Sequence, residues 1–524
     1  MSEPSPISPV EAHSAPASAK SMALSADHSS SDLSDLQVKG VPGGYRELLA
    51  IAVPMILSSG TQSLMHVIDR IYLTWYSEAA VAAALPAGIL FWAGLSLPFG
   101  VVSYANAFVA QYDGAKQPGR AASCVWQAVY FAVACGLLLI IPAYWSESLF
   151  RIVGHESTVQ RLEVEYFSWL CMGAAPALLA GALSCFFSGR GQTRLVLLVN
   201  ASSMLMNGVL DYAMVFGWGP IPQMGMAGAA IATNIANVFA AICYLLLLTR
   251  HDARVKYSFW KHWRLDKVLM FDLFKFGGPS GLQMFLDVAG FTAFMMMIGW
   301  IGQRELAATN IAFNLNTLAF IPVIGVGIAV STLVGQRIGE GRPDIAEKSV
   351  RKGFVLAGGI MIAFGAIYVL APQVLLAPYE YGANSHVADP TAVASAIAVE
   401  NSVTKGNFAE VRAVVIVLLR FVAIYSFFDA MAIIFGSAIR AAGDTVFSMI
   451  VTFLCAWGLL VLPTYLTWTF VQENRAENLL FWSWIWCSVY VMTLGFIYFF
   501  RFQGGRWKTM SVIEPESAFS DATA

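Results

Sequence analysis

The chain has 524 residues, of which 57% are hydrophobic and only 12% are charged. Soluble domains carry about 25% charged residues, so this composition excludes an ordinary soluble protein and indicates a membrane protein. The net charge of −2 argues against nucleic acid as a partner.

The first 40 residues are rich in Ser, Ala and Pro and contain no apolar run. Such a segment cannot bury a core, so we expect 1–40 to be a disordered cytoplasmic tail. Met1 is not followed by a charged start and a short apolar core, so no cleavable signal peptide is expected. The first spanning helix then serves as the targeting signal.

From about residue 45 the chain contains twelve apolar segments, each long enough to cross a bilayer of about 30 Å as a helix. They occupy roughly 48–76, 81–110, 122–144, 166–188, 195–216, 227–249, 272–301, 306–334, 352–377, 411–436, 446–470 and 480–501. The predicted fold is an all-α integral membrane protein with twelve transmembrane helices. A large soluble helical core is the alternative, but it needs an amphipathic coat that these segments do not show.

The chain also repeats itself, because residues 54–118 recur at 279–343 with an offset of 225. The matching pairs include Pro54 and Pro279, Trp75 and Trp300, Gln111 and Gln336, Gly114 and Gly339, and Pro118 and Pro343. Further on, residues 191–193 match 443–445 at an offset of 252, so the second copy has gained 252 minus 225, or 27, residues. We assign this surplus to an extracytoplasmic insertion at about 378–410.

Six segments fall in each copy, so both copies start on the same side of the membrane and are related by a pseudo-two-fold axis along its normal. The predicted organisation is two six-helix lobes with a connection between them. The N-lobe covers 45–250, a cytoplasmic linker 251–271, the C-lobe 272–503 and a cytoplasmic tail 504–524.

Lys and Arg residues predict the orientation, since they accumulate in cytoplasmic loops. The loops on the side of the two termini hold 22 of the 31 basic residues. Both termini should therefore be cytoplasmic, and we expect a multi-pass protein of a bacterial inner membrane.

A few charged residues lie inside the predicted helices, where each costs roughly 2.5–3.5 kcal/mol on insertion scales. Asp69 and Asp211 precede the outer ends of their helices by about seven and five residues, which puts both carboxyls about 10 Å beneath the outer surface. Asn207 lies on the same helix face as Asp211, and Thr233 could add a hydroxyl. This set of oxygens predicts a site for Na⁺ or for a shared proton. The alternative is that Asp69 pairs with Arg70 or His66 as a structural contact.

Two further acids, Asp287 and Asp429, lie near the middle of C-lobe helices without an obvious basic partner. We predict that they line a cavity, and the alternative for each is a buried hydrogen bond between helices.

Catalytic and nucleotide-binding motifs are not found in the sequence, so we expect neither an enzyme nor ATP-driven transport, and no cofactor beyond a coupling ion. The seven cysteines fall in apolar runs without metal-ligand spacing.

Five stretches together carry a resemblance to a known family. They are Leu49-Ala-Ile-Ala-Val-Pro54, Val67-Ile-Asp69, Ala227-Gly-Ala-Ala-Ile-Ala-Thr233, Gly335-Gln-Arg-Ile-Gly-Glu340 and Ile439-Arg-Ala-Ala-Gly-Asp-Thr445. Over about residues 45–500 the chain resembles the multidrug and toxic compound extrusion (MATE) family.

The resemblance implies an antiporter that exports mostly cationic, amphipathic drug-like compounds by alternating access, against inward Na⁺ or H⁺. It implies that Asp69, Asn207, Asp211 and Thr233 form the N-lobe coupling site and that Asp287 and Asp429 are the acidic positions of the C-lobe. Drug-like small molecules and membrane lipids are the expected partners, and we expect a monomer.

The sequence departs from the family pattern at three places. Asp287 stands where one bacterial branch usually carries Glu, Arg70 replaces a small or neutral residue, and Leu73-Thr-Trp75 lacks an expected Gly. An alternative function is a lipid-linked oligosaccharide flippase of the same superfamily. Such flippases usually line their cavity with Arg and Lys, whereas these helices offer Asp. A membrane-embedded enzyme is disfavoured because no catalytic set is present.

Overall fold

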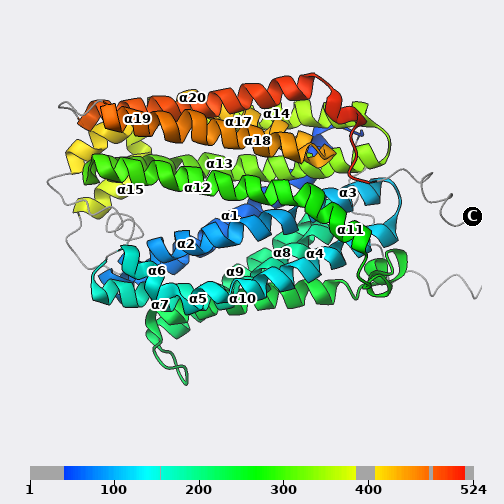
Figure 1. Cartoon of the computed structure of the whole chain (residues 1–524), viewed down its shortest axis with the longest axis horizontal. Helices are drawn as coiled ribbons and strands as arrows, with labels where there is room; N and C mark the ends of the chain where they lie inside the picture. The colour runs from blue at the N-terminus through cyan, green and yellow to red at the C-terminus, as the bar shows by residue number, and fades with distance from the viewer. Residues whose placement is uncertain (1–40, 154, 385–407, 471–475, 514–524) are drawn as a thin grey trace, which may run out of the picture. The chain divides into compact units, whose positions relative to one another are not determined.

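The computed structural model describes residues 41–153, 155–384, 408–470 and 476–513. The predicted tail 1–40, residues 385–407 of the predicted insertion and residues 514–524 lie outside this range. Within it the chain is almost entirely helical, and the helices follow the order of the predicted segments (Figure 1).

The first copy of the repeat forms the lower half of the molecule in Figure 1. Its helices are α1 Tyr45–Tyr76, α2 Glu78–Ser103, α3 Ala105–Gly114, α4 Pro118–Leu138, α5 Ile141–Tyr144, α6 Ser146–Val153, α7 Ser157–Met172, α8 Ala174–Gly189, α9 Thr193–Phe216 and α10 Gly225–Leu247. The second copy forms the upper half, with one exception. Its helices are α11 Lys267–Asp272, α12 Gly278–Ile301, α13 Gln303–Gly339, α14 Pro343–Leu370, α15 Pro372–Asn384, α17 Phe408–Ala442, α18 Thr445–Cys455, α19 Leu462–Phe470 and α20 Ala476–Gln503. The exception is α11, which lies beside α4 of the first copy.

Eleven helical stretches among the described residues are long and apolar enough to cross a membrane. The pair α7 and α8, bent by 42° at Gly173, makes a twelfth span when the two are counted together. Each copy then contributes six spans, as the sequence predicts. Most observed helices begin a few residues before the predicted apolar segments, because their polar ends are helical too. The segment predicted at 352–377 is wrong at both ends, since α14 runs from Pro343 to Leu370 and α15 begins at Pro372.

Contacts between the copies obey the same symmetry as the sequence. α1 packs on α9 of its own lobe and on α13 of the other, and α12, its equivalent, packs on α18 and on α2. A Cβ atom on Gly100 of α2 would lie 2.6 Å from Gly281 Cα, and one on Gly325 of α13 would lie 2.6 Å from Ile56 N. Gly325 and Gly281 are the residues 225 positions after Gly100 and Ile56. Small residues let helix backbones approach this closely in membranes.

The segment between the copies covers the end of the N-lobe. It contains a π-helical turn at Asp252–Lys256 and a 3₁₀ turn at Phe259–Lys261. The Tyr257 hydroxyl donates a hydrogen bond to Asp113, and Trp126 Nε1 donates to Phe259 O at 3.0 Å. The Arg190 guanidinium stacks over the Tyr257 ring, 3.9 Å from its centroid. This connection is therefore docked on the N-lobe through buried aromatic side chains.

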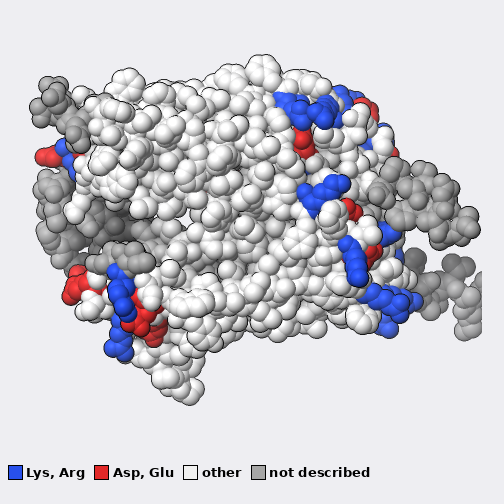
Figure 2. All heavy atoms as spheres, in the orientation of Figure 1, with Lys and Arg blue, Asp and Glu red and all other residues white. Residues whose placement is uncertain are grey.

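The two ends of the helix bundle differ in the number of basic side chains that they carry (Figure 2). Lys and Arg gather at the end shown on the right, where α3, α4, α8, α11 and the last turns of α13 and α17 lie. We call this the basic end. It contains the loops that the sequence predicts to be cytoplasmic, and the assignment of this end to the cytoplasm stays a prediction.

Candidate functional site

The four predicted N-lobe residues come together between three adjacent helices. Asp69 lies on α1, Asn207 and Asp211 lie on α9, and Thr233 lies on α10, and these helices pack against one another. Asp69, Asn207 and Asp211 are 5%, 0% and 0% exposed. The carboxyl groups of Asp69 and Asp211 lie beside each other. The predicted grouping is therefore present in the fold.

The cluster leaves several oxygens without a hydrogen bond. Asn207 Nδ2 donates to Thr233 Oγ1 at 3.4 Å, and Thr233 Oγ1 donates to Ala229 O at 3.1 Å. By contrast, Asp69 Oδ1, Asn207 Oδ1 and both carboxyl oxygens of Asp211 are buried and accept no hydrogen bond from the described residues. Buried polar atoms normally have partners, so four orphaned acceptors in one place fit a bound cation or proton.

Neighbouring side chains extend the site. Tyr72 on α1 and Tyr166 on α7 are both within electrostatic range of Asp69 and Asp211. His66 and Arg70 are exposed and lie within electrostatic range of Asp69. Tyr166 was not singled out in the sequence, because a tyrosine in an apolar run has the same pattern whether it faces lipid or a carboxyl group.

This arrangement is suited to a monovalent ion rather than to a transition metal. Two carboxyl groups, an amide oxygen and a hydroxyl offer hard oxygen ligands. Two carboxyl groups this close can also hold one proton between them, since ionising both places like charges together. In the part of the chain that the structure describes, no group of three or more His, Cys, Asp or Glu side chains is arranged to hold a metal ion.

The C-lobe acids occupy a second polar region. Asp287 on α12 and Asp429 on α17 are half-buried, and both lie within electrostatic range of Tyr490 on α20. They therefore lie in one neighbourhood of the C-lobe, although they are 142 residues apart in the sequence.

The sequence suggested that these acids lack an obvious basic partner, and the charge of Arg440 lies within electrostatic range of Asp287. The predicted helix ended at 436, but α17 continues to Ala442, so Arg440 is in its last turn. Its guanidinium donates to Ser437 Oγ at 3.3 Å, consistent with a side chain that points back along the helix.

Gln283, one turn before Asp287, adds an amide to this region. Its Nε2 donates to Thr452 Oγ1 at 3.0 Å, while its Oε1 is buried and has no hydrogen-bond partner among the described residues. The Thr452 and Tyr498 hydroxyls are 3.0 Å apart and continue the network. The C-lobe therefore combines acids, a buried amide and hydroxyls.

Comparison with known proteins identifies the family. The sequence matches MatE over residues 54–213 and 279–399. It is 24% identical over 479 residues to the probable multidrug resistance protein NorM of Thermotoga maritima, covering 91% of this chain and 96% of that protein. It is 25% identical over 417 residues to the multidrug resistance protein PmpM of Pseudomonas aeruginosa, covering 79% and 82%.

Solved structures show the same fold. An outward-facing multidrug resistance MATE transporter of the MOP superfamily superposes with a TM-score of 0.76 at 19% identity, over 90% of this chain and 98% of that one. A MOP superfamily transporter from Pyrococcus furiosus, described by the reverse polarity of its binding pocket, gives 0.73 at 19% identity and the same coverage. The match in sequence spans more than half of the residues and both copies of the repeat, and the chain belongs to the MatE family of membrane transporters.

Proposed function

We propose that the chain is a cation-coupled antiporter that exports cationic or amphipathic drug-like compounds in exchange for Na⁺ or H⁺. The observation that carries this proposal is the cluster of orphaned oxygens on Asp69, Asn207 and Asp211. A buried polar group without a partner costs about 1–3 kcal/mol. A bound cation or proton supplies the missing contacts of these oxygens and so removes this free-energy cost.

The drug class of the substrate is supported by the relatives, which include proteins named as multidrug resistance proteins. It is also supported by the sign of the intramembrane charges. The four acids Asp69, Asp211, Asp287 and Asp429 outnumber the two arginines, Arg70 and Arg440, that lie within electrostatic range of one of them. An acidic cavity favours cations, whereas a flippase for lipid-linked sugars needs cationic groups for the pyrophosphate.

The position of α1 suggests how ion binding is coupled to the lobes. α1 carries Asp69 against Asp211 of α9 and also packs on α13 of the other lobe. An ion that draws the two carboxyls together therefore acts on a helix that both lobes contact. Its binding can then shift the balance between arrangements of the lobes, provided that it binds one arrangement more tightly.

The test uses purified protein in liposomes loaded with a fluorescent cationic dye. A Na⁺ gradient and a pH gradient are applied separately, and dye efflux is followed for the wild type, for Asp69→Asn and for a matched control. The control is Asp344→Asn, which changes an exposed acid in the first turn of α14. Efflux driven by one gradient and lost only in Asp69→Asn supports the proposal. Dye that moves with neither gradient, in vesicles that do translocate a lipid-linked sugar, would favour the flippase instead.

A further inference from the structure

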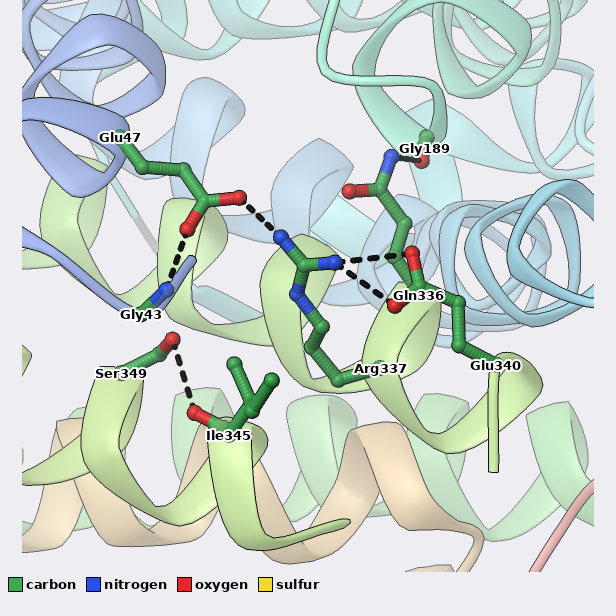
Figure 3. Close-up of polar contacts among 8 residues, drawn as sticks. All are labelled: Gly43, Glu47, Gly189, Gln336, Arg337, Glu340, Ile345 and Ser349. Carbon is green, nitrogen blue, oxygen red and sulfur yellow. Dashed lines mark hydrogen bonds and ion pairs between the residues drawn. The ribbon is translucent and has the colours of Figure 1, made fainter. Parts of the chain in front are cut away.

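Two duplicated glutamines reach across the boundary between the lobes at the basic end. Gln111 lies near the end of α3, and Gln336, its equivalent 225 residues later, lies near the end of α13. Gln111 Nε2 donates to Ala441 O of α17 at 2.8 Å, and Gln336 Nε2 donates to Gly189 O of α8 at 3.1 Å (Figure 3). Gly189 and Ala441 are themselves equivalent at the offset of 252. The two hydrogen bonds are therefore one interaction, made twice by the repeat.

A second pair of contacts has equivalent acceptors, although its donors are not equivalent in the repeat. The Tyr104 hydroxyl donates to Arg440 O at 2.9 Å, and the Thr332 hydroxyl donates to Ser188 O at 3.3 Å. The acceptors Ser188 and Arg440 again differ by 252 positions. All four accepting carbonyls lie in the last turns of α8 and α17, where carbonyl groups lack a partner in the helix ladder. Ser188 O and Arg440 O also accept the backbone N–H of Gly191 and Gly443, whereas the glutamines supply the hydrogen bonds to Gly189 O and Ala441 O.

The helix ends also touch backbone to backbone. A Cβ atom on Gly114 would lie 2.0 Å from Gln336 O, and one on Gly339 would lie 2.1 Å from Gln111 O. Gly114 and Gly339 are equivalent at the offset of 225. Any larger residue at either position would push the two helices apart, because real Cβ atoms do not approach oxygen this closely. The lobes are closed against each other at this end.

Different segments cover the two glutamines. On one side, Glu47 accepts hydrogen bonds from Arg337, the neighbour of Gln336, and from Gly43 N at 2.7 Å (Figure 3). On the other side, the segment after α20 reaches the lobe boundary, where Val512 N donates to Gln111 Oε1 at 3.0 Å. Both ends of the membrane part therefore meet at this boundary.

From this geometry we infer that Gln111, Gln336, Gly114 and Gly339 form a two-fold latch that holds the basic end closed and opens once in each transport cycle. The inference rests on the proposed alternating-access function. A latch made of amide-to-carbonyl hydrogen bonds is reversible, because water replaces both partners when the lobes separate. If the glutamine is removed, the carbonyl is left buried and unpaired in the closed state, whereas water still binds it in the open state. Removing the glutamine therefore destabilises the closed state and favours opening.

The test measures the separation of the lobes at the basic end. Spin labels are placed at Arg194→Cys in α9 and Val446→Cys in α18, which are equivalent exposed positions directly after the accepting helix ends. Distances are recorded by double electron–electron resonance in Gln111→Ala, Gln336→Ala, the double variant and the control Gln192→Ala. The control removes the same side chain at the same end, where it does not cap its helix. Protein without the engineered cysteines shows how much the seven native ones contribute to labelling.

The ratio of the longer to the shorter distance should rise about tenfold in Gln336→Ala. It should rise by at least about tenfold in Gln111→Ala, which also removes the hydrogen bonds from Ser511 and Val512, and by at least about a hundredfold in the double variant. Distances that stay at the wild-type distribution in the double variant, or that change only as much as in Gln192→Ala, would overturn the latch. Gly339→Ala gives a second test that keeps both glutamines, since its methyl group prevents close contact with Gln111 O. It should shift the distribution in the same direction.

The distances are measured without drug and without an ion gradient, so this test is separate from the test of antiport. Wild-type vesicles that move no dye would reject the proposed function but leave the latch to be judged by its distances. Dye efflux with an unchanged distance distribution in the double variant would reject the latch alone.

Discussion

The sharpest test of the coupling site removes its two carboxyl groups singly and together. If Asp69 and Asp211 hold one ion, then Asp69→Asn, Asp211→Asn and the double variant should all abolish driven efflux to the same extent. The physical reason is that one remaining carboxylate is too little to replace the hydration shell of the ion. Two independent sites would instead leave each single variant partly active and make the double variant worse.

The expected size of the effect follows from the adjacency of the two buried carboxyls. At about 2.4 Å and an effective dielectric constant of about 20, one carboxylate attracts a monovalent cation by about 7 kcal/mol. This loss is partly offset, because an ion-free pair that holds one proton must ionise both carboxyls to bind the cation in the wild type, against a repulsion of about 4 kcal/mol at about 4 Å. The net loss is about 3 kcal/mol, or roughly 100-fold weaker binding. Independent losses of this size would multiply to roughly 10,000-fold in the double variant.

The assay combines Na⁺ binding by calorimetry with dye efflux in vesicles, under a Na⁺ or a pH gradient, and Asp344→Asn serves as the folding and expression control. Losses in the double variant that equal the sum of the two single free-energy losses would refute a shared site. Na⁺ binding that survives in the double variant would move the coupling site to Asp287 and Asp429.

Two other predictions concern the C-lobe and the docked linker. Asp287→Glu should keep efflux while Asp287→Ala loses it, because Glu retains the carboxyl group that the proposed role needs. Equal loss in both would indicate a tightly packed structural position. Tyr257→Phe removes the hydrogen bond to Asp113 and should lower the free energy of unfolding by about 1–3 kcal/mol. The measurement is thermal or denaturant unfolding in detergent, and an unchanged unfolding midpoint would contradict the prediction. Burial raises the pKa of Tyr257 above its usual value of 10.0, so the unfolded chain loses the phenol proton first. The stabilisation is therefore complete below about pH 10 and is lost at higher pH, where the wild type and Tyr257→Phe should converge.

Helix number, lobe composition and repeat register could all be predicted from the sequence. Apolar runs report membrane burial directly, and the duplication places equivalent residues in equivalent contacts, as Gly100 with Gly281 and Gly325 with Ile56 show. The ends of the helices were harder to predict from the sequence. The predicted segment stopped at 334, but α13 runs to Gly339, because Gln336 and Arg337 are polar residues that remain helical while they contact the other lobe.

Contacts between distant segments set the other limit. The grouping of Asp69 with Asp211 could be predicted because depth in the membrane is a one-dimensional quantity that can be counted along each helix. The approach of Arg440 to Asp287 could not, since it depends on which way a side chain turns at a helix end. Tyr490 was missed for a similar reason: hydropathy does not distinguish a tyrosine that faces two acids from one that faces lipid.

The packing of each lobe's first helix on the other lobe has a consequence for the origin of the chain. Since α1 packs on α13 and α12 packs on α2, a single six-helix unit would leave the partner surface of its first helix uncovered. Two copies of an ancestral unit could each have covered that surface on the other, as subunits of a symmetric homodimer do. Fusion of the two genes would then have made a permanent monomer from an obligate pair. It would also have freed the halves to diverge, which is how one could keep Asp69 and Asp211 while the other acquired Asp287 and Arg440.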